Sequence, residues 1–295
     1  MILALVAALR PKQWTKNLLL FAGVLFSQQL NHPELVLRAA IGFLAFSLLA
    51  GCTYLFNDLR DVSADRLHPR KRNRPIASGR LPERVAWGAL FPLLLVALSL
   101  CWWLGTGFMI AAGIYVALNL AYSLGLRNLV LIDVFIIALG FVLRAIAGVE
   151  LLRGPAPGTE LSPWLLVCTF FGALFLGLSK RRRELANAGD VASTQRRVLE
   201  KYSPELLDGL LTVSAAASLM GYALYTIWPS TVAKFGTEAM LYTIPFVAYG
   251  IFRYLYLLRV SEHAEDPSLV LLTDRPMAWC VVLYLLAVVA ILYHA

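Results

Sequence analysis

Residues 57–66 have the sequence Asn-Asp-Leu-Arg-Asp-Val-Ser-Ala-Asp-Arg, which follows a long apolar run and precedes a cluster of basic residues. Asn57, Asp61 and Asp65 lie four residues apart, so on a helix their side-chain oxygens form one stripe, whereas Asp58 points elsewhere. Oxygen ligands on one face at a membrane boundary suit Mg²⁺, which takes one or two protein carboxylates and leaves other positions to water and phosphates. A solvated helix end is the competing interpretation, and the neighbouring bases favour the metal site over it.

The apolar composition around this stretch predicts a membrane protein. Of the 295 residues, 59% are hydrophobic, which is too many for an ordinary soluble domain. Apolar runs of about twenty residues recur along the chain, and each can cross a hydrocarbon layer ~30 Å thick. We therefore predict an all-α membrane protein, a bundle of nine transmembrane helices that forms a single domain of residues 1–295. The predicted spans are 14–30, 35–56, 83–104, 107–124, 129–150, 162–180, 206–227, 239–259 and 271–293.

Positive charge outside these spans marks one side of the membrane. Most Lys and Arg lie at the N-terminus and in the loops at 57–82, 125–128, 181–205 and 260–270. Because Lys and Arg collect on the cytoplasmic side, we expect the N-terminus and the two long loops, 57–82 and 181–205, on the cytoplasmic side of the inner (plasma) membrane, which makes these loops the candidate functional face. No cleavable signal peptide is expected, because Arg10-Pro11-Lys12 follows the apolar residues 1–9 without a small-residue cleavage site.

The bases at the predicted cytoplasmic side have two interpretations, as orientation signals or as phosphate ligands. They lie in four groups, near Lys16, at 66–74, at Arg127 and at 180–183. A basic run beside a span most often only fixes orientation, and this alternative stays open for the first and fourth groups. Together the four groups carry more positive charge than one diphosphate requires.

Arg144 lies in the middle of the predicted span 129–150. An arginine at the bilayer centre costs about 2.5–3.5 kcal/mol, so we expect its side chain to face the interior of the bundle. Asp133 shares this helix face but lies about 16 Å away along the axis, which is too far for a direct ion pair. We predict a polar cavity with Asp133 near its mouth and Arg144 deeper inside. The alternative for Arg144 is a structural pair or a carbonyl cap.

These patterns resemble a known family of membrane enzymes, the UbiA superfamily of intramembrane prenyltransferases. The resemblance lies in Asn57-x-x-x-Asp61-x-x-x-Asp65 between the second and third spans, followed by Arg74-Pro75 and Ser78-Gly79. It covers nearly the whole chain and implies the nine-span fold. Most members transfer a prenyl group from a prenyl diphosphate to an aromatic acceptor and carry a second Asp-x-x-x-Asp motif. Here Asp133 is followed four residues later by Ile137, so the second motif is incomplete.

The chain is similar to one branch of that superfamily, the decaprenyl-phosphate phosphoribosyltransferases. The similar segments are 10–17, 57–66, 122–127, 141–148 and 179–185. The resemblance implies transfer of phosphoribose from 5-phosphoribosyl diphosphate to a polyprenyl phosphate, with release of diphosphate, in the synthesis of cell-wall arabinan precursors. It further implies Mg²⁺ as the cofactor, the phosphoribosyl donor and the membrane lipid as partners, a homo-oligomer such as a trimer, and no nucleic acid.

The resemblance also implies roles for individual residues. Asn57, Asp61 and Asp65 would be the catalytic residues that hold Mg²⁺ on the donor diphosphate. The residues expected to bind substrate are Lys16, Arg66, Arg70, Arg72, Arg74, Tyr122, Arg127, Asp133, Arg144, Lys180 and Arg181, of which the last two would hold a phosphate at the rim of the site. Because the acceptor is already an anion, the reaction would need no general base.

Two other functions remain open from the sequence. A prenyltransferase acting on an aromatic acceptor would share the fold and the first motif, and the incomplete second motif argues against it. A carrier or lipid transporter would use the bases to bind head groups without catalysis, and it would keep its function after Asp61→Ala.

Overall fold

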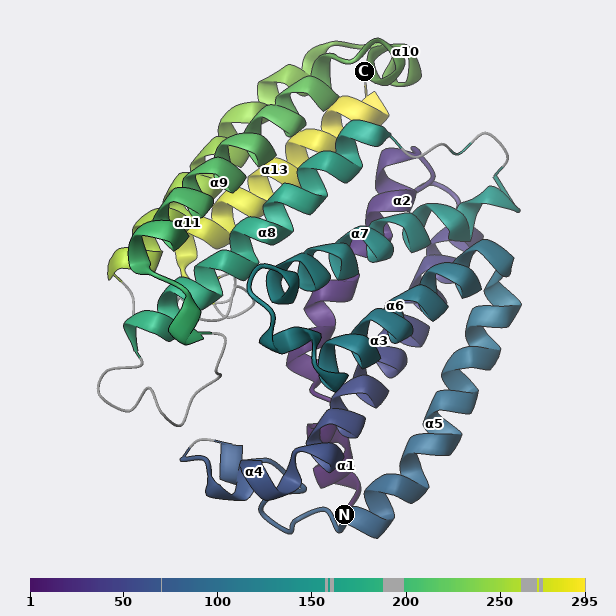
Figure 1. Cartoon of the computed structure of the whole chain (residues 1–295). Helices are drawn as coiled ribbons and strands as arrows, with labels where there is room; N and C mark the ends of the chain where they lie inside the picture. The colour runs from purple at the N-terminus through teal and green to yellow at the C-terminus, as the bar shows by residue number, and fades with distance from the viewer. Residues whose placement is uncertain are drawn as a thin grey trace. The chain divides into compact units, whose positions relative to one another are not determined.

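The computed structural model describes residues 1–69, 71–156, 159, 162–187, 199–260, 270 and 273–294. Its regular secondary structure is helical, with no strand in this described part of the chain (Figure 1). Among the residues that the structure describes, eight helical segments are long and apolar enough to cross a membrane, which confirms the prediction of an all-α, multi-pass membrane protein. They are α3 (Pro33–Arg60), α5 (Glu83–Leu104), α6 (Thr106–Leu124), α7 (Ile132–Arg153), α8 (Pro163–Ala186), α9 (Pro204–Ile227), η6 (Ala239–Thr243) continued by α11 (Ile244–Val260), and α13 (Arg275–His294).

Shorter helices precede and connect these segments. The short α-helices are α1 (Ile2–Ala8), α2 (Phe21–Phe26), α4 (Val62–Leu67) and α10 (Pro229–Phe235). The 3₁₀ helices are the ten-residue η1 (Pro11–Leu20) and the three-residue η2 (Lys71–Asn73), η3 (Leu126–Asn128) and η5 (Leu199–Lys201).

The first predicted span, 14–30, has a different structure from the one expected. In its place the chain forms ten residues of 3₁₀ helix in η1 and six residues of α-helix in α2. Long 3₁₀ runs are uncommon, so tertiary contacts must support this one. Asn17 Nδ2 donates to Ser47 Oγ on α3 (2.9 Å), and a Cβ atom on Gly23 would lie 2.2 Å from Gly148 O on α7.

The chain divides into two compact units. Unit 1 comprises Met1–Leu126 and Leu143–Thr159, and unit 2 comprises Arg127–Val142 and Glu160–Ala295. The helix α7 contributes its first half to unit 2 and its second half to unit 1, so both units share one continuous helix. The single domain expected for the chain stays a prediction.

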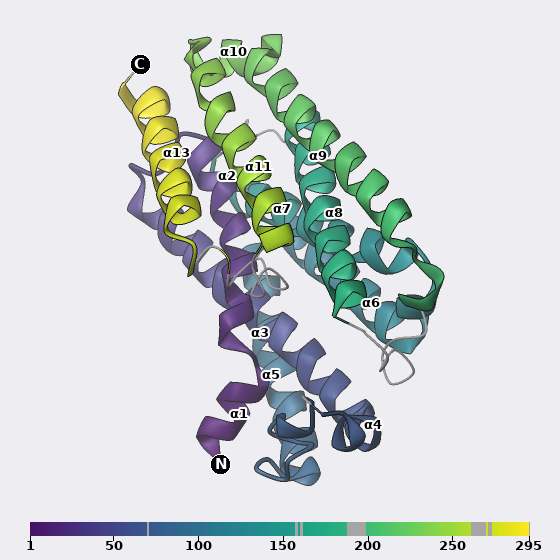
Figure 2. The same cartoon turned by 90° about the vertical axis from the view of Figure 1, so that its left-hand side faces the viewer.

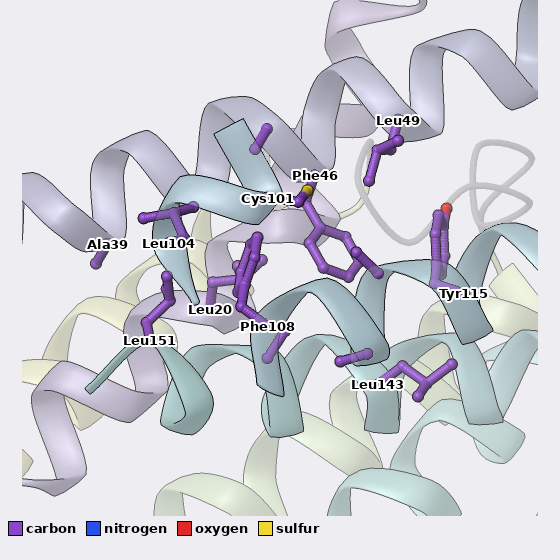
Figure 3. Close-up of a cluster of buried hydrophobic side chains, with 14 of the residues drawn as sticks. Leu20, Ala39, Phe46, Leu49, Cys101, Leu104, Phe108, Tyr115, Leu143 and Leu151 are labelled. Carbon is purple, nitrogen blue, oxygen red and sulfur yellow. The ribbon is translucent and has the colours of Figure 1, made fainter. Parts of the chain in front are cut away.

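Unit 1 has a core of aromatic and aliphatic side chains, contributed mainly by η1, α3, α5, α6 and the second half of α7 (Figure 3). The ring of Phe46 lies edge-on to Phe108, with centroids 5.6 Å apart, and 5.2 Å from the ring of Tyr115. A Cβ atom on Gly148 would lie 2.4 Å from Leu20 O, so the close approach of α7 to the end of η1 requires glycine. This packing positions the helices that carry the buried polar residues of unit 1.

Unit 2 packs α8 along α9, and α11 against both α9 and α13 (Figure 2). Its core includes Phe175 and Tyr254, whose ring centroids lie 5.6 Å apart in an edge-on arrangement. The first half of α7 joins this core through the buried side chains of Val134 and Ala138. The N-terminal end of α7 is thereby held beside the polar residues of α8.

Candidate active site

The junction of α3 and α4 carries the predicted metal-binding residues. Helix α3 ends at Arg60, Asp61 has φ −94° and ψ 11°, and α4 begins at Val62. Hydrogen bonds from Asp61 N to Asn57 O (2.9 Å) and from Asp65 N to Asp61 O (2.8 Å) continue the helical register through the junction. Asn57, Asp61 and Asp65 therefore stay one turn apart in the structure, as their spacing predicts.

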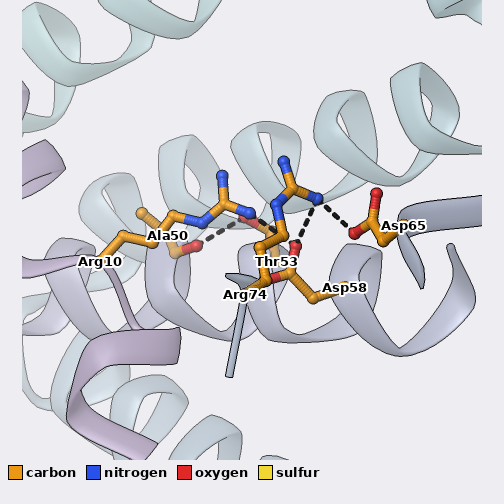
Figure 4. Close-up of polar contacts among 6 residues, drawn as sticks. All are labelled: Arg10, Ala50, Thr53, Asp58, Asp65 and Arg74. Carbon is orange, nitrogen blue, oxygen red and sulfur yellow. Dashed lines mark hydrogen bonds and ion pairs between the residues drawn. The ribbon is translucent and has the colours of Figure 1, made fainter. Parts of the chain in front are cut away.

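Two carboxylates and two guanidinium groups meet at this junction and form the arginine–carboxylate cluster, which comprises Arg10, Asp58, Asp65 and Arg74 (Figure 4). Asp58 Oδ1 accepts hydrogen bonds from Arg10 Nη2 (2.5 Å) and from Arg74 Nη1 (3.0 Å). The same Arg74 Nη1 donates to Asp65 Oδ2 (2.6 Å). Both carboxylates are buried, whereas 30% of the Arg10 side chain and 29% of the Arg74 side chain are exposed. The cluster is therefore closed on its acidic side and open on its basic side.

The position of Asp58 corrects the prediction that its side chain points away from the acidic stripe. Asp58 and Asp65 are seven residues apart, which is almost two full helical turns, so they lie on one face and bind the same arginine. Arg10 approaches from the turn between α1 and η1, where its backbone has φ 54°. Arg74 approaches from the turn that follows η2. Two segments, 48 and 16 residues from Asp58 in the sequence, thus converge on the end of α3.

Other bases predicted near this junction have different surroundings. Arg66 Nη2 donates to Glu83 Oε1 (2.9 Å) in an exposed ion pair. Arg72 in η2 is exposed, and Lys16 in η1 is half-buried. Arg70 lies outside the described residues. Phosphate binding by these residues stays a prediction.

Arg144 is buried in unit 1, as its position within a span predicts. Its Nε donates to Asn17 Oδ1 (2.7 Å), its Nη2 donates to Tyr115 OH (3.0 Å), and its guanidinium carbon lies 4.7 Å from the centre of the Tyr115 ring. Asn17 in turn donates to Ser47 Oγ. These contacts join η1, α3, α6 and α7, and they favour the structural interpretation of Arg144.

Asp133 and Arg181 form a buried ion pair in unit 2. Arg181 Nε donates to Asp133 Oδ2 (2.6 Å), and Arg181 also contacts Glu184. Tyr202 OH donates to Asp133 Oδ1 (2.9 Å) and accepts from Leu131 N (2.7 Å). Burial raises the pKa of Tyr202 to about 12, so its hydroxyl stays protonated and donates to the carboxylate. The ion pair and the tyrosine fix the start of α7 against α8 and the residue that follows η5.

This ion pair corrects two expectations. Arg181 was expected at the rim of a phosphate site, but only 1% of its side chain is exposed. Successive side chains on an α-helix point about 100° apart. Arg181 therefore faces α7, while the preceding residue, Lys180, points away from it and is exposed. Asp133, expected near the mouth of a cavity, is fully buried.

The segment 122–127 ends α6 and forms part of η3. Tyr122 and Arg127 are both half-buried. The carbonyl of Ser123 accepts a hydrogen bond from Arg60 Nη1, which links this segment to the end of α3. Substrate binding by Tyr122 and Arg127 stays a prediction.

The structure adds Arg10, Asp58 and Tyr202 to the residues singled out from the sequence. The seven-residue spacing to Asp65 could have identified Asp58, and Arg10 begins the similar segment 10–17. No local pattern indicates Tyr202, because 69 residues separate it from Asp133. Contacts of that range are visible only in the folded chain.

Comparison with known proteins adds family and fold to this geometry. A model described as the UbiA prenyltransferase family matches residues 17–275. A decaprenyl-phosphate phosphoribosyltransferase of Corynebacterium glutamicum is 36% identical over 292 residues, covering 95% of this chain and 86% of that relative. A protein of the same name from Mycolicibacterium smegmatis is 34% identical over 280 residues, covering 92% of this chain and 86% of the relative.

Among solved structures, a UbiA homolog from Archaeoglobus fulgidus bound to GPP and Mg²⁺ is similar to this chain. The TM-score is 0.70 at 20% sequence identity, covering 98% of this chain and 99% of that one. At 20% sequence identity this similarity shows a shared fold and nothing about function. The helices of the described part of the chain agree with that fold.

Proposed function

The chain belongs to the UbiA prenyltransferase family, and we propose that it transfers 5-phosphoribose from 5-phosphoribosyl diphosphate to a polyprenyl phosphate of the decaprenyl type. The structural observation that supports the proposal is the arginine–carboxylate cluster, which gathers two guanidinium groups and two carboxylates at one helix junction. A donor with a diphosphate and a 5-phosphate requires cationic ligands for its oxygens and carboxylates for its metal. The names of the relatives at 34% and 36% identity supply the substrate class.

Asn57, Asp61 and Asp65 would hold Mg²⁺ on the donor diphosphate. Their amide and carboxylate oxygens are the hard ligands that Mg²⁺ prefers, and the backbone keeps them one turn apart across the α3–α4 junction. In the described part of the chain, no three His, Cys, Asp or Glu side chains are grouped closely enough to hold a metal by themselves. The proposal therefore requires substrate phosphates and water to complete the coordination, as is usual for Mg²⁺ in proteins. Bound Mg²⁺ would make diphosphate a better leaving group.

The proposed reaction replaces one bond at C1 of the ribose with another. The bond from C1 to the diphosphate oxygen breaks, its electron pair leaves with diphosphate, and the ribose passes through an oxocarbenium-like state. An oxygen of the lipid phosphate then forms the new bond to C1. Arg74 and Lys16 would neutralise donor phosphates while negative charge builds up on the leaving group. The attacking phosphate is already an anion, so no side chain is required as a general base.

We also propose nine membrane crossings with a cytoplasmic N-terminus, in the inner membrane. Together, η1 and α2 extend over about 29 Å, because a 3₁₀ helix rises about 2.0 Å and an α-helix about 1.5 Å per residue. This length is close to the ~30 Å of the hydrocarbon layer, which supports residues 11–26 as a crossing of mixed geometry. Gly79→Cys and Gly154→Cys should react with an impermeant thiol reagent from opposite sides of sealed vesicles. Labelling of both from one side would refute this topology.

The decisive experiment on the reaction uses purified protein, Mg²⁺, labelled 5-phosphoribosyl diphosphate and polyprenyl phosphates of several chain lengths. We expect a labelled lipid that forms only with Mg²⁺ and is lost in Asp61→Ala. Failure to label any of the lipids would refute the proposal. Diphosphate release from geranyl diphosphate that depends on an aromatic acceptor would instead identify a prenyltransferase, and lipid binding that survives Asp61→Ala without turnover would identify a carrier.

The product of this reaction would be a precursor of cell-wall arabinan, and we propose a homo-oligomer such as a trimer as the working assembly. The oligomer rests on the resemblance to relatives. Light scattering on the detergent-solubilised protein measures the mass of the complex, and a mass equal to one chain would refute the oligomer.

A further inference from the structure

We propose that Asp58 is a positioning residue, which holds Arg10 and Arg74 as a pair of cations for a phosphate group of the donor. The inference rests on the proposed function and deepens it by separating a metal-binding role from an arginine-holding role within one acidic segment. Asp58 itself would touch neither the metal nor the reacting atoms.

The geometry of Asp58 is that of an anchor for two guanidinium groups. One oxygen, Oδ1, accepts from both Arg10 Nη2 and Arg74 Nη1, and 3% of the side chain is exposed. Two like charges held at one oxygen are stable together only beside compensating anions, and here Asp58 and Asp65 supply them. Neutralising Asp58 would therefore remove the charge that keeps the two arginines together.

Arg10 is held from the same face of α3 as Asp58. Its guanidinium carbon lies 4.8 Å from the centre of the Tyr54 ring, and Tyr54 precedes Asp58 by one helical turn. The backbone of Arg10 has φ 54° and ψ 63°, a left-handed conformation that non-glycine residues adopt at a cost. Strained residues of this kind gather where the surrounding structure needs a side chain in one place. Two contacts and a strained backbone thus direct Arg10 to Asp58.

The same contacts argue against Asp58 as a metal ligand. Its Oδ1 already receives two charged donors, and their charge repels any further cation at that oxygen. Asp65 differs, because its backbone lies in register with Asn57 and Asp61, while its Oδ2 accepts from Arg74 Nη1. The two roles proposed here are therefore separate, with Asp58 holding the arginines and Asn57, Asp61 and Asp65 as the proposed ligands of Mg²⁺.

The open side of the cluster suits a phosphate. A guanidinium presents five N–H donors in a rigid fork that matches phosphate oxygens. Each arginine uses one terminal nitrogen on the carboxylates, and about 30% of each side chain is exposed. Figure 4 shows the other terminal nitrogen of Arg10 and of Arg74 pointing away from the carboxylates, to the same side of the view. Two guanidinium groups held at one carboxylate oxygen can bind one phosphate group from adjacent positions.

The test compares donor affinity with metal dependence in purified full-length protein. Binding of 5-phosphoribosyl diphosphate, inorganic diphosphate and ribose 5-phosphate is measured at saturating Mg²⁺ for the natural protein and for Asp58→Asn. We expect Asp58→Asn to weaken binding of the donor by about tenfold, which is the loss typical of one charge-assisted contact. The Mg²⁺ concentration for half-maximal activity and the KM for polyprenyl phosphate should stay unchanged. If Asp58→Asn also weakens binding of inorganic diphosphate, the arginines bind the diphosphate of the donor. If it weakens binding of ribose 5-phosphate instead, they bind the 5-phosphate.

Three further variants complete the design. Arg10→Gln should match Asp58→Asn, and the double variant should be no weaker than either single one, because both remove the same contact. Arg10→Lys keeps the charge and loses the fork, so it should also weaken donor binding, and it tests the proposal if Asp58→Asn does not fold. Asp208→Asn removes an exposed partner of Arg182 in unit 2 and should bind the donor normally.

Two results would overturn the proposal. A shifted Mg²⁺ dependence in Asp58→Asn would make Asp58 a metal ligand. Normal donor affinity in folded Asp58→Asn, or in Arg10→Lys when the former does not fold, would reduce the cluster to a structural role. A natural protein that binds no phosphoribosyl donor would refute the proposed function instead, so the two failures are distinguishable.

Discussion

Replacing Asp133 with alanine should destabilise the protein far more than the loss of an exposed ion pair does. The change removes the carboxylate that accepts from Arg181 Nε at 2.6 Å and from Tyr202 OH at 2.9 Å. The Arg181 guanidinium would then stay enclosed, with 1% of its side chain exposed, and would keep Glu184 as an acidic partner.

The magnitude follows from the burial of the pair. Removing one partner of a buried ion pair costs about 3–5 kcal/mol, because the remaining charge stays out of water. Glu184 compensates in part, so we expect Asp133→Ala to fall near the lower end of that range. Asp133→Asn keeps the shape and can still accept from Tyr202, so its loss should be smaller. The matched control is Asp208→Ala, which breaks an exposed pair with Arg182 and should cost at most about 1 kcal/mol.

The assay is thermal unfolding of the purified protein in detergent, followed by tryptophan fluorescence. We expect the order natural protein, Asp208→Ala, Asp133→Asn and Asp133→Ala, from most to least stable. Adding Arg181→Met to Asp133→Ala should recover stability, because it removes the enclosed charge that the first change leaves. Equal melting temperatures for Asp133→Ala and Asp208→Ala would refute the reasoning, since burial would then contribute nothing to the pair.

Two further predictions concern packing and pH. Gly148→Ala should lower the melting temperature, because its Cβ atom would lie 2.4 Å from Leu20 O and overpacking costs about 1–3 kcal/mol. In the control, Gly250→Ala on α11, the added Cβ meets no atom within 4 Å, so this change should be neutral or stabilising. Equal effects of the two changes on the melting temperature would contradict the close approach of α7 to η1. Two hydrogen bonds from Arg253 hold the pKa of Asp274 below its ordinary value, so this carboxylate stabilises the fold above about pH 4 and loses that contribution as the pH falls further. Melting curves between about pH 6 and pH 3 should therefore show the advantage of the natural protein over Asp274→Asn shrinking in acid, and a constant difference would refute the linkage.

The membrane-spanning helices could be predicted because each needs a long apolar run. Helix α5 occupies Glu83–Leu104, the residues predicted for the third span, since charged or turn-forming residues bound its apolar stretch on both sides. The segment 11–26 could not be predicted in the same way. The hydropathy of a segment does not distinguish an α-helix from a 3₁₀ helix. The geometry of this segment depends on the contacts of Asn17 with α3 and of Gly23 with α7.

The candidate site shows the same division between local and distant information. The register of Asn57, Asp61 and Asp65 is a local property, and the backbone hydrogen bonds follow it. The cluster built on Asp58 depends on its contact with Arg10 across 48 residues, and neither segment carries a local signal of that pairing. The direction of Arg181 depends on which side of α8 meets α7, and a run of consecutive bases carries no information about that choice.

The helix α7 has a consequence for dissecting the protein. Its backbone passes from unit 2 into unit 1 between Val142 and Leu143, in the middle of an uninterrupted ladder of hydrogen bonds. A cut at that boundary would leave two frayed half-helices, each too short to nucleate alone. Neither unit is therefore expected to fold after excision at that boundary. A chimera of two relatives should therefore be joined in a loop, so that α7 comes intact from one parent.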